Sequence, residues 1–550
     1  MNNACFAYAA LVASSLLFAG CGTSPDSFEV RRAEMIAKTG NCIWNTDGCD
    51  MLYYPTNAPI TEESFVSRRL AKSHGTKVTA ISYCPLSSGF GLFTARKAGD
   101  FMDRVFESGK SRNAARDFAE KLDTDALEMA CRFARKEGKN VFVSIRMNDT
   151  HDSSHSKKRP SPLFSPFKER HPECLVGEME GPNRKGVMTW SSVDYSHPEV
   201  REALKGYIRQ FCENYDIDGV ELDFNRHAMF FRSTFKGGVA SEAEIAIMTQ
   251  LMREIRALTE RLGRIRGKPF LLLARTDDSI AHDRAVGYDP TQWMAEGLID
   301  YWIAGGYTRI DDYDDVVAVA RRYPKVKLFA SMDESRVDGS CGSSKKPYIH
   351  GRWFWTDLGD CAVPFYAACI SAAMSAGFDG IWHFNIEESP MPRVVSIDPA
   401  DTECVDKRYY ATERDPRDLN WHLKDGLRFL KTPDIDPTHP RKMAAAETYS
   451  FSMIVGDDFA AAAKRGKVPT CGIRLLATGS DKVTVRMNDE LLKLGAKDGD
   501  ILKLPVRQDC VRRGRNRFEI TANAGLTLHD FVLDIVYSDG QGNGEKGEDR

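Results

Sequence analysis

Asp218-Gly219-Val220-Glu221-Leu222-Asp223-Phe224-Asn225 alternates polar and apolar side chains over its second half. Successive side chains of a β-strand point to opposite faces, so Glu221, Asp223 and Asn225 share one face and the apolar residues share the other. The apolar face suits packing against helices, which leaves the polar face to point into the centre of a closed sheet. Buried carboxylates need donors, and Arg146 and Arg275 are suitable ones because they end neighbouring candidate strands.

Seven further strand patterns surround this one. Short apolar, β-branched runs alternate with longer segments of helical period from residue 40 to residue 390, as parallel sheets require. The candidate strands span residues 41–45, 77–83, 140–147, 219–224, 269–275, 299–304, 327–331 and 380–384. Helical patterns cover residues 125–137, 198–215, 241–262, 313–322 and 363–376. Eight strand–helix units in this length predict an α/β fold, a (β/α)8 TIM barrel.

The sequence pattern changes after residue 390. From residue 447 onward, polar turns separate six strand patterns, which predict a smaller all-β sandwich domain. We therefore expect a signal peptide over residues 1–20, a tether over 21–38, the barrel over 39–390, a bracing linker and helix over 391–445, the β-sandwich over 446–538 and a disordered tail over 539–550.

Composition fits this organisation. The 550 residues include 75 Lys+Arg against 78 Asp+Glu, a net charge of −3, with 42% hydrophobic and 28% charged residues. Such a chain lacks the basic excess of nucleic-acid binders and the low apolar content of disordered proteins. We expect a globular protein with no nucleic-acid partner.

The N-terminus carries an apolar run over residues 8–18 that is short for a membrane helix and typical of a signal peptide. Leu17-Phe18-Ala19-Gly20-Cys21 resembles the lipobox of bacterial lipoproteins, which implies lipidation of Cys21. The prediction is a protein exported and lipid-anchored to a bacterial membrane, facing the periplasm or the cell surface; a plain secretory peptide with a spare cysteine is the alternative.

Of the 14 cysteines, Cys5 and Cys21 belong to the N-terminal segment, and export permits disulfides among the other 12. Cys42 with Cys49, Cys341 with Cys361 and Cys471 with Cys510 are plausible pairs. None of the cysteines shows metal-ligand spacing.

Polar residues are dense at the predicted strand ends, where TIM barrels place their chemistry. Glu221, deeper in its strand, favours a structural ion-pair network, whereas Asp223, nearer the mouth, favours chemistry. The other candidate contacts for a substrate are Arg146, Asn148, Asn225, Arg226, His227, Arg275, Asp277, Tyr307, His383 and Asn385, with Trp44, Tyr307 and Trp382 as possible stacking faces.

Several motifs resemble glycosyl hydrolase-like family 10. These are Asp218-Gly-Val-Glu-Leu-Asp-Phe, His171-Pro-Glu-Cys, Val193-Asp-Tyr-Ser-His-Pro-Glu-Val-Arg201 and Gly287-Tyr-Asp-Pro-Thr-Gln-Trp-Met-Ala-Glu-Gly-Leu-Ile-Asp300. The resemblance covers roughly residues 40 to 390. It implies a glycoside hydrolase that acts on a polysaccharide or oligosaccharide substrate. Because the sequence contains no divalent-metal motif, P-loop or nucleophile elbow, we expect no cofactor and no metal.

Glycoside hydrolysis usually uses two carboxyl groups, one protonated and one ionised. Asp223 is our candidate for the ionised group, and Glu334 is the first candidate for the acid, followed by Glu387 and then Asp277. Chitinase-type barrels carry their acid where this chain has Asn225, and an amide cannot protonate a leaving group. A non-catalytic glycan-binding lipoprotein is the alternative function.

The insertion over residues 149–197 predicts one wall of a cleft. Its basic run Lys157-Lys158-Arg159 would suit an acidic or sulfated polysaccharide, or is merely a solvated loop.

Overall fold

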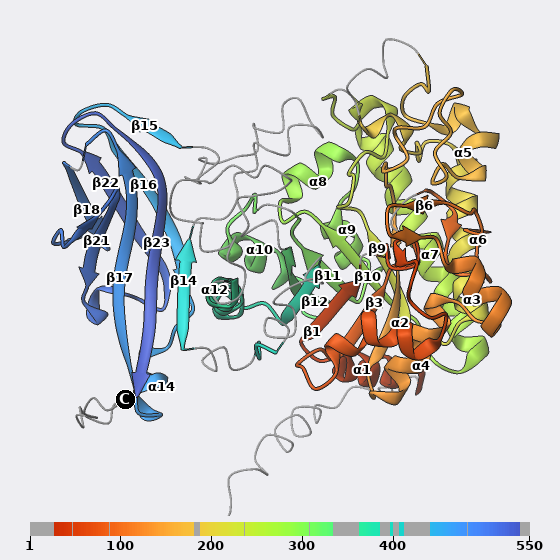
Figure 1. Ribbon diagram of the computed structural model, residues 1–550, viewed down its shortest axis with the longest axis horizontal. Coiled ribbons are helices and arrows are strands. Elements are labelled where there is room, and N and C mark those ends of the chain that lie inside the picture. The colour runs from red at the N-terminus through yellow and green to blue at the C-terminus, as the bar shows by residue number, and fades with distance from the viewer. Residues whose placement is uncertain are drawn as a thin grey trace, which may run out of the picture.

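Eight parallel strands close into a barrel (Figure 1). The computed structural model describes residues 27–46, 48–86, 89–180, 188–235, 237–306, 309–333, 362–384, 396–399, 406–411, 440–480 and 482–539. The barrel strands are β1 (Cys42–Thr46), β3 (Ala80–Tyr83), β8 (Asn140–Arg146), β9 (Gly219–Asp223), β10 (Leu271–Thr276), β11 (Tyr301–Ala304), β12 (Lys327–Asp333) and β13 (Gly380–Phe384). Each strand pairs with the next along this series, and β1 pairs with both β3 and β13. The predicted (β/α)8 barrel and its eight strands are confirmed.

Helices lie between the strands where the apolar period predicts them. These are α4 (Ala126–Lys136), α6 (Pro198–Asn214), α7 (Glu242–Arg266), α10 (Tyr313–Ala320) and α12 (Ala362–Ala376). Helix α7 begins with a capping box between Ser241 and Glu244 and ends at Gly267, whose φ of 72° suits a left-handed cap. Shorter helices are α2 (Glu62–Arg68), α3 (Ala115–Leu122), α5 (Pro166–Arg170), α8 (Ile280–Val286) and α9 (Pro290–Ala295).

The N-terminal end of the barrel is closed by α1 (Ser27–Thr39). Met35 of this helix is buried with side chains from inside the barrel, and the Asn140 amide donates to the backbone oxygen of Met35 and to Thr39 Oγ1. The expected tether over residues 21–38 is therefore wrong from Ser27 onward, because the apolar side chains of α1 cover the barrel floor.

The barrel interior is filled by the alternate residues that each strand directs inward. Its apolar members are Ile43, Ala80, Phe142, Leu271, Leu273, Tyr301, Ile303, Phe329, Trp382 and Phe384. Strand β9 contributes Glu221 to this interior instead of an apolar group, since Glu221 is fully buried and contacts residues of three other barrel strands. The predicted inward orientation of the polar face is confirmed.

Short strands fill the connections before β8: β2 (Tyr54–Pro55), β4 (Leu92–Phe93), β5 (Asp100–Phe101), β6 (Glu107–Ser108) and β7 (Ser111–Arg112). In the insertion between β8 and α6, the described part includes α5 and 3-10 turns at Pro172–Cys174 and Met188–Ser191. Lys157, Lys158 and Arg159 are exposed, as expected of a solvated loop.

The C-terminal part is all-β, as predicted, and consists of two antiparallel sheets. One sheet has the order β14-β23-β17-β21-β20 with β15 beside β23, and the other has the order β16-β22-β18-β19. The strands are β14 (Lys407–Ala411), β15 (Arg441–Met443), β16 (Thr448–Val455), β17 (Lys467–Thr478), β18 (Val483–Met487), β19 (Glu490–Leu491), β20 (Lys497–Asp498), β21 (Ile501–Val506), β22 (Gly514–Ala522) and β23 (Leu526–Asp539), with one helix, α14 (Phe459–Lys464).

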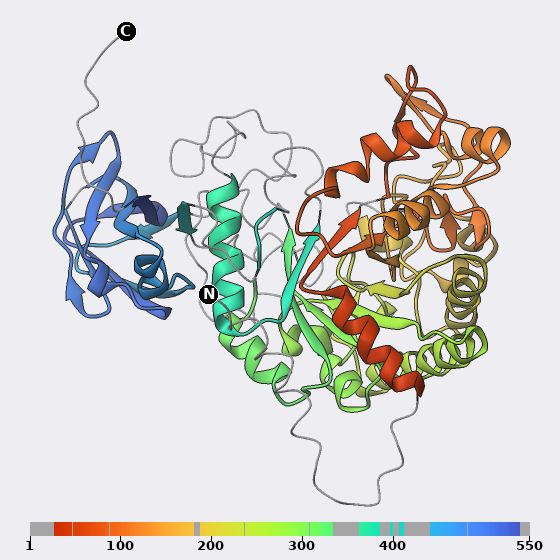
Figure 2. The same ribbon diagram turned by 90° about the horizontal axis from the view of Figure 1, so that it is seen from below.

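The expected linker over residues 391–445 contains two of these strands, because β14 and β15 both pair with β23. The sandwich begins in that region and not at residue 446. The helix expected within residues 421–430 lies outside the described residues. Helix α12 stands between the sandwich and the barrel strands (Figure 2).

Cysteine pairing was predicted wrongly where the structure describes both partners. Cys42, Cys471 and Cys510 are buried thiols, so neither the Cys42–Cys49 nor the Cys471–Cys510 bridge forms. Among the described helices, none has the length and apolar character needed to cross a bilayer.

Candidate active site at the barrel mouth

Glu221 lies in the middle of the barrel. One of its carboxylate oxygens accepts hydrogen bonds from the Asn45 amide and the Ser144 hydroxyl, and the other accepts one from Trp382 Nε1, each at 2.7 Å. Burial, with the nearby charge of Asp223, raises the pKa of Glu221 to about 7. The expected ion-pair network is therefore wrong at this residue: its described partners are neutral donors. The substrate contact that the sequence predicts for Glu221 stays a prediction.

Asp223 ends β9 at the carboxyl edge of the barrel, where TIM barrels place their chemistry. Arg275 Nη1 lies 3.2 and 3.3 Å from its two carboxylate oxygens, and the Asn225 backbone N–H donates to Oδ1 at 3.0 Å. The Arg275 guanidinium lies 4.4 Å from the centre of the Trp382 ring, on which it stacks. Arg275 is thus the donor expected for Asp223, and it covers the ring expected to stack on a sugar.

Asn225 joins Asp223 to a second group of polar residues. Its side-chain amide donates to Asp277 Oδ1 at 2.7 Å, and His282 Nδ1 lies 2.8 Å from Asp277 Oδ2. Asp283, the next residue on α8, is fully buried beside them. Burial and the charge of Asp277 raise the pKa of Asp283 well above its usual range.

A third group surrounds Asp149, just beyond the end of β8. Arg146 Nη1 contacts Asp149 Oδ2 at 2.7 Å, and both His151 Nδ1 and the His151 backbone N–H contact Oδ1. Although burial acts against it, the neighbouring His151 and Arg146 hold the pKa of Asp149 well below its usual range. Arg146 was expected to serve Glu221 or Asp223 and instead contacts Asp149.

Arg226 and His227 lie in the same group. Arg226 Nη2 is 3.4 Å from His151 Nε2, and the side chain remains 13% exposed. The Thr150 backbone N–H donates to His227 Nδ1 at 2.8 Å, which places the ring proton of neutral His227 on Nε2. Both residues lie near the mouth, as predicted.

Two predicted contact residues have structural roles. The Asn148 side chain is buried and bonds backbone groups of Val193 and Met229, which fixes the loop after β8. His383 alternates with the inward-facing Trp382 and Phe384, so it faces the surrounding helices. Burial lowers its pKa to about 3, and neither ring nitrogen has a hydrogen-bond partner among the described residues.

Trp44 likewise faces outward and is fully buried in the layer between strands and helices. The stacking role predicted for Trp44 is therefore wrong. The substrate contact predicted for His383 fails for the same reason. In both cases side-chain alternation along the strand, and not distance from the strand end, decides the orientation.

Four predicted site residues fall outside the described residues: Glu334, Glu387, Tyr307 and Asn385. The same is true of Cys21. Their assignments stay predictions.

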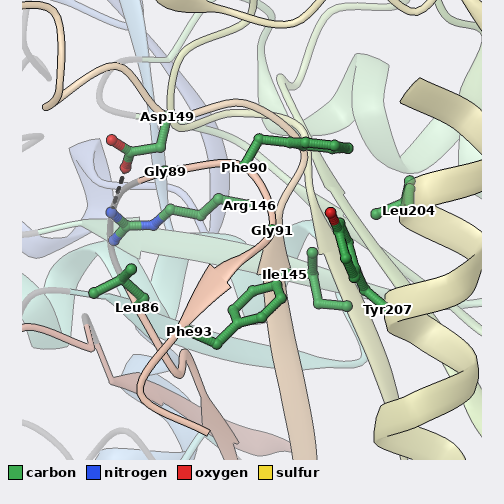
Figure 3. A pocket seen from close by; sticks show the side chains of 10 residues that line it. All are labelled: Leu86, Gly89, Phe90, Gly91, Phe93, Ile145, Arg146, Asp149, Leu204 and Tyr207. Atoms are coloured by element: carbon green, nitrogen blue, oxygen red, sulfur yellow. Dashed lines mark hydrogen bonds and ion pairs between the residues drawn. The ribbon is translucent and has the colours of Figure 1, made fainter. Parts of the chain in front are cut away.

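A small pocket of about 340 Å³, open solvent included, borders the Asp149 group (Figure 3). Phe90, Phe93 and Tyr207 form its aromatic side, and Arg146 with Asp149 forms the opposite side. Leu86, residues 89–93 and α6 supply most of its wall. Of the described part of the insertion over residues 149–197, Asp149 alone lines the pocket.

Sequence reasoning missed Asp149 and Asp283 as members of these groups. Asp149 stands within the polar run that follows β8, and its proximity to Asn148 and His151 was available as a hint. Asp283 carries no such hint, since it lies inside a short helix and only the fold brings it to Asp277.

Comparison with known proteins finds no matching family model and no matching curated protein. Membership of glycosyl hydrolase-like family 10 therefore stays a prediction.

Among solved structures, the glycoside hydrolase domain of PgaB (BpsB) from Bordetella bronchiseptica is similar with a TM-score of 0.40 and 10% identity, over 65% of this chain and 98% of that domain. An Anoxybacillus α-amylase gives 0.37 and 9% identity, over 88% and 98% of the two chains. The GH36 α-galactosidase AgaA from Geobacillus stearothermophilus gives 0.35 and 13%, over 90% of this chain and 58% of that one. These structures are glycoside hydrolases, and at this similarity no residue role is carried over from them.

Proposed function

We propose that this protein hydrolyses glycosidic bonds of a polysaccharide or glycoconjugate. The observation that carries the proposal is the placement of Asp223 at the carboxyl edge of a closed parallel barrel, held by Arg275 and by the Asn225 backbone. Arg275 Nη1 contacts both carboxylate oxygens of Asp223, the group to which we assign the role of base or nucleophile.

The proton donor is assigned to Glu334 or Glu387. Glu334 directly follows Asp333, the last residue of β12, and Glu387 follows the end of β13 by three residues. Asp277, the third candidate, is less suited because Asn225 and His282 already contact its two oxygens. Its expected role as a substrate contact is less favoured for the same reason.

We also propose that the chain is exported and held at a bacterial membrane by a lipid on Cys21. The apolar run over residues 8–18 and the lipobox-like sequence that follows it support this localisation. Labelling of the cell-expressed chain with a fatty-acid analogue, compared with Cys21→Ala, tests it: loss of label from the variant is expected, and equal labelling contradicts lipidation of Cys21.

A reducing-sugar screen over neutral, acidic and sulfated polysaccharides tests the catalytic proposal. On a substrate that the wild type cleaves, we expect Asp223→Asn to lower kcat by about 10²–10⁴-fold, the usual contribution of a positioned acid or base.

Asp218→Asn is the matched control. Asp218 precedes the same strand at its opposite end, is equally buried and is paired with Arg135 and Lys268. We expect Asp218→Asn to affect stability while kcat stays near that of the wild type. Equal kcat in Asp223→Asn and the wild type would show that Asp223 has no catalytic role.

One observation favours the alternative of a glycan-binding protein without turnover. Asp223 and Arg275 are 1% and 0% exposed, and they pair with each other inside the barrel. If a binding assay with the same polysaccharides detects a complex while the reducing-sugar screen detects no new reducing ends, this alternative holds and hydrolysis is ruled out for the glycans tested.

A further inference from the structure

A cluster of three buried groups lies behind the mouth, where β10 is followed by α8. Asp277, His282 and Asp283 each place one ligand atom so that the three atoms lie within 4.8 Å of one another. All three residues are buried, at 3%, 5% and 0% exposure. Two carboxylates and an imidazole at this spacing offer the ligand types of a transition-metal site.

The surroundings of the Asp283 carboxylate are a second, independent observation. Neither of its carboxylate oxygens has a hydrogen-bond partner of ordinary geometry among the described residues, although the hydroxyls of Tyr288 and Thr276 face it. The Thr276 hydroxyl donates instead to the Asp277 backbone oxygen. No described Lys or Arg pairs with Asp283. A buried carboxylate that has no cationic partner is disfavoured in its charged form, so a cation or a proton at Asp283 would stabilise this cluster.

We propose that Asp277, His282 and Asp283 bind one divalent transition-metal ion of the Zn²⁺ or Mn²⁺ type. Carboxylate oxygens and an imidazole nitrogen are ligands that both ions accept. The cation neutralises the two carboxylates and gives Asp283 a positively charged partner, which no Lys or Arg of the described ranges supplies. The proposal revises the expectation of no metal, and it does not depend on the proposed hydrolysis.

The Asp149 group has a similar spacing of ligand atoms to the Asp277 cluster but a different charge environment. Asp149, His151 and His227 also lie within 4.8 Å of one another. There, however, Arg146 already pairs with Asp149 at 2.7 Å, and the Thr150 N–H already occupies His227 Nδ1. A cation at Asp149 would face the Arg146 guanidinium, so this cluster is not a metal site.

The site has a structural connection to Asp223. The Asn225 side chain donates to Asp277 Oδ1 while its backbone N–H donates to Asp223 Oδ1. Holding Asp277 therefore holds Asn225, which makes the metal ligands positioning residues for the carboxylate at the mouth.

Calorimetric titration of the full chain, stripped with a chelator, with ZnCl₂ and separately with MnCl₂ tests the proposal. We expect the wild type to bind one equivalent of at least one ion and to melt at a higher temperature with it, by mass action on the folded state. Asp283→Asn should weaken this equivalent at least about tenfold, the usual scale for losing part of a metal site, and should abolish the rise in melting temperature.

Asp149→Asn is the matched control, because it removes a buried carboxylate from the second cluster, and it should leave the affinity for the metal unchanged. His282→Gln, checked for folding by circular dichroism, replaces Asp283→Asn if that variant does not fold. The proposal is wrong if the wild type takes up neither ion, if the cluster variant binds the ion as tightly as the wild type, or if Asp149→Asn removes the bound equivalent.

Discussion

Glu221 and Asp223 are two residues apart on one strand and point the same way, yet their surroundings differ. Glu221 lies deep in the barrel among neutral donors, whereas Asp223 lies at the mouth against Arg275. A buried acid without a cationic partner prefers its protonated form, which is why the pKa of Glu221 rises to about 7. Two acids of the same sequence motif thus have different surroundings because they lie at different depths in the barrel.

This raised pKa makes stability depend on pH. Well below pH 4.5, Glu221 is protonated in both the folded and the unfolded chain, and its contribution to the free energy of unfolding is at its maximum. This contribution decreases as the pH rises towards 7, because the unfolded chain releases the proton while the folded chain still holds it. Between pH 5 and 8 we expect a loss of about 2.5 kcal/mol from this residue, at 1.36 kcal/mol per pKa unit.

Urea unfolding of the wild type and Glu221→Gln, followed by tryptophan fluorescence at several pH values, measures this loss. Glutamine does not titrate, so the stability of the wild type relative to the variant should fall across this range. A difference between the two proteins that stays constant from pH 5 to pH 8 would contradict the raised pKa.

At the scale of elements, α1 is fixed to the barrel by a buried arginine. Arg32 Nη1 lies 3.3 Å from both Asp300 oxygens, and Arg32 also contacts Glu260 of α7. Asp300 is 5% exposed and has a second partner in Arg256. The helix thus adds an ion-pair network to the apolar closure of the barrel floor.

Arg32→Ala is expected to lower the free energy of unfolding by about 2–3 kcal/mol. Breaking a buried ion pair costs about 3–5 kcal/mol, and Arg256 compensates part of that cost at Asp300. Arg31→Ala is the matched control: Arg31 is exposed and bonds only Ser27 among the described residues, so we expect a change within about 0.5 kcal/mol. Equal losses in the two variants, measured by urea unfolding, would show that α1 is not held through Arg32.

At the scale of the whole molecule, the sandwich is docked on the barrel through α10 and α12. Arg515 of β22 contacts Asp312 and Asp314 at the start of α10, each at 2.9 Å. Gly456 packs directly against the Ser371 backbone of α12, where a Cβ would overlap the backbone oxygen. A buried cluster inside the sandwich, in which Tyr410 and Tyr537 donate to Asp457, lies next to this contact.

Gly456→Ala is expected to lower the free energy of unfolding by about 1–3 kcal/mol, as inserting a methyl group into a packed contact does. Gly472→Ala is the matched control within the same sandwich, because a Cβ there would meet only the Leu504 backbone oxygen, at 3.6 Å. Thermal unfolding measures both variants. If Gly456→Ala is as stable as Gly472→Ala, the close approach of the sandwich to α12 does not contribute to stability.

The barrel, its eight strands, the inward orientation of the β9 acids and the all-β nature of the C-terminal part could all be predicted from local sequence patterns. Strand alternation and helical period are local, and a chain of this kind has few ways to bury both patterns. The partners of those acids could not be predicted in this way, because they depend on which side chains lie close together in the folded chain. Arg146 contacts Asp149, Arg275 contacts Asp223, and neutral groups contact Glu221. The same holds for three other features: the outward placement of His383, the closure of the barrel by α1, and the proximity of Asp277 to Asp283. Each depends on how separate elements pack against one another.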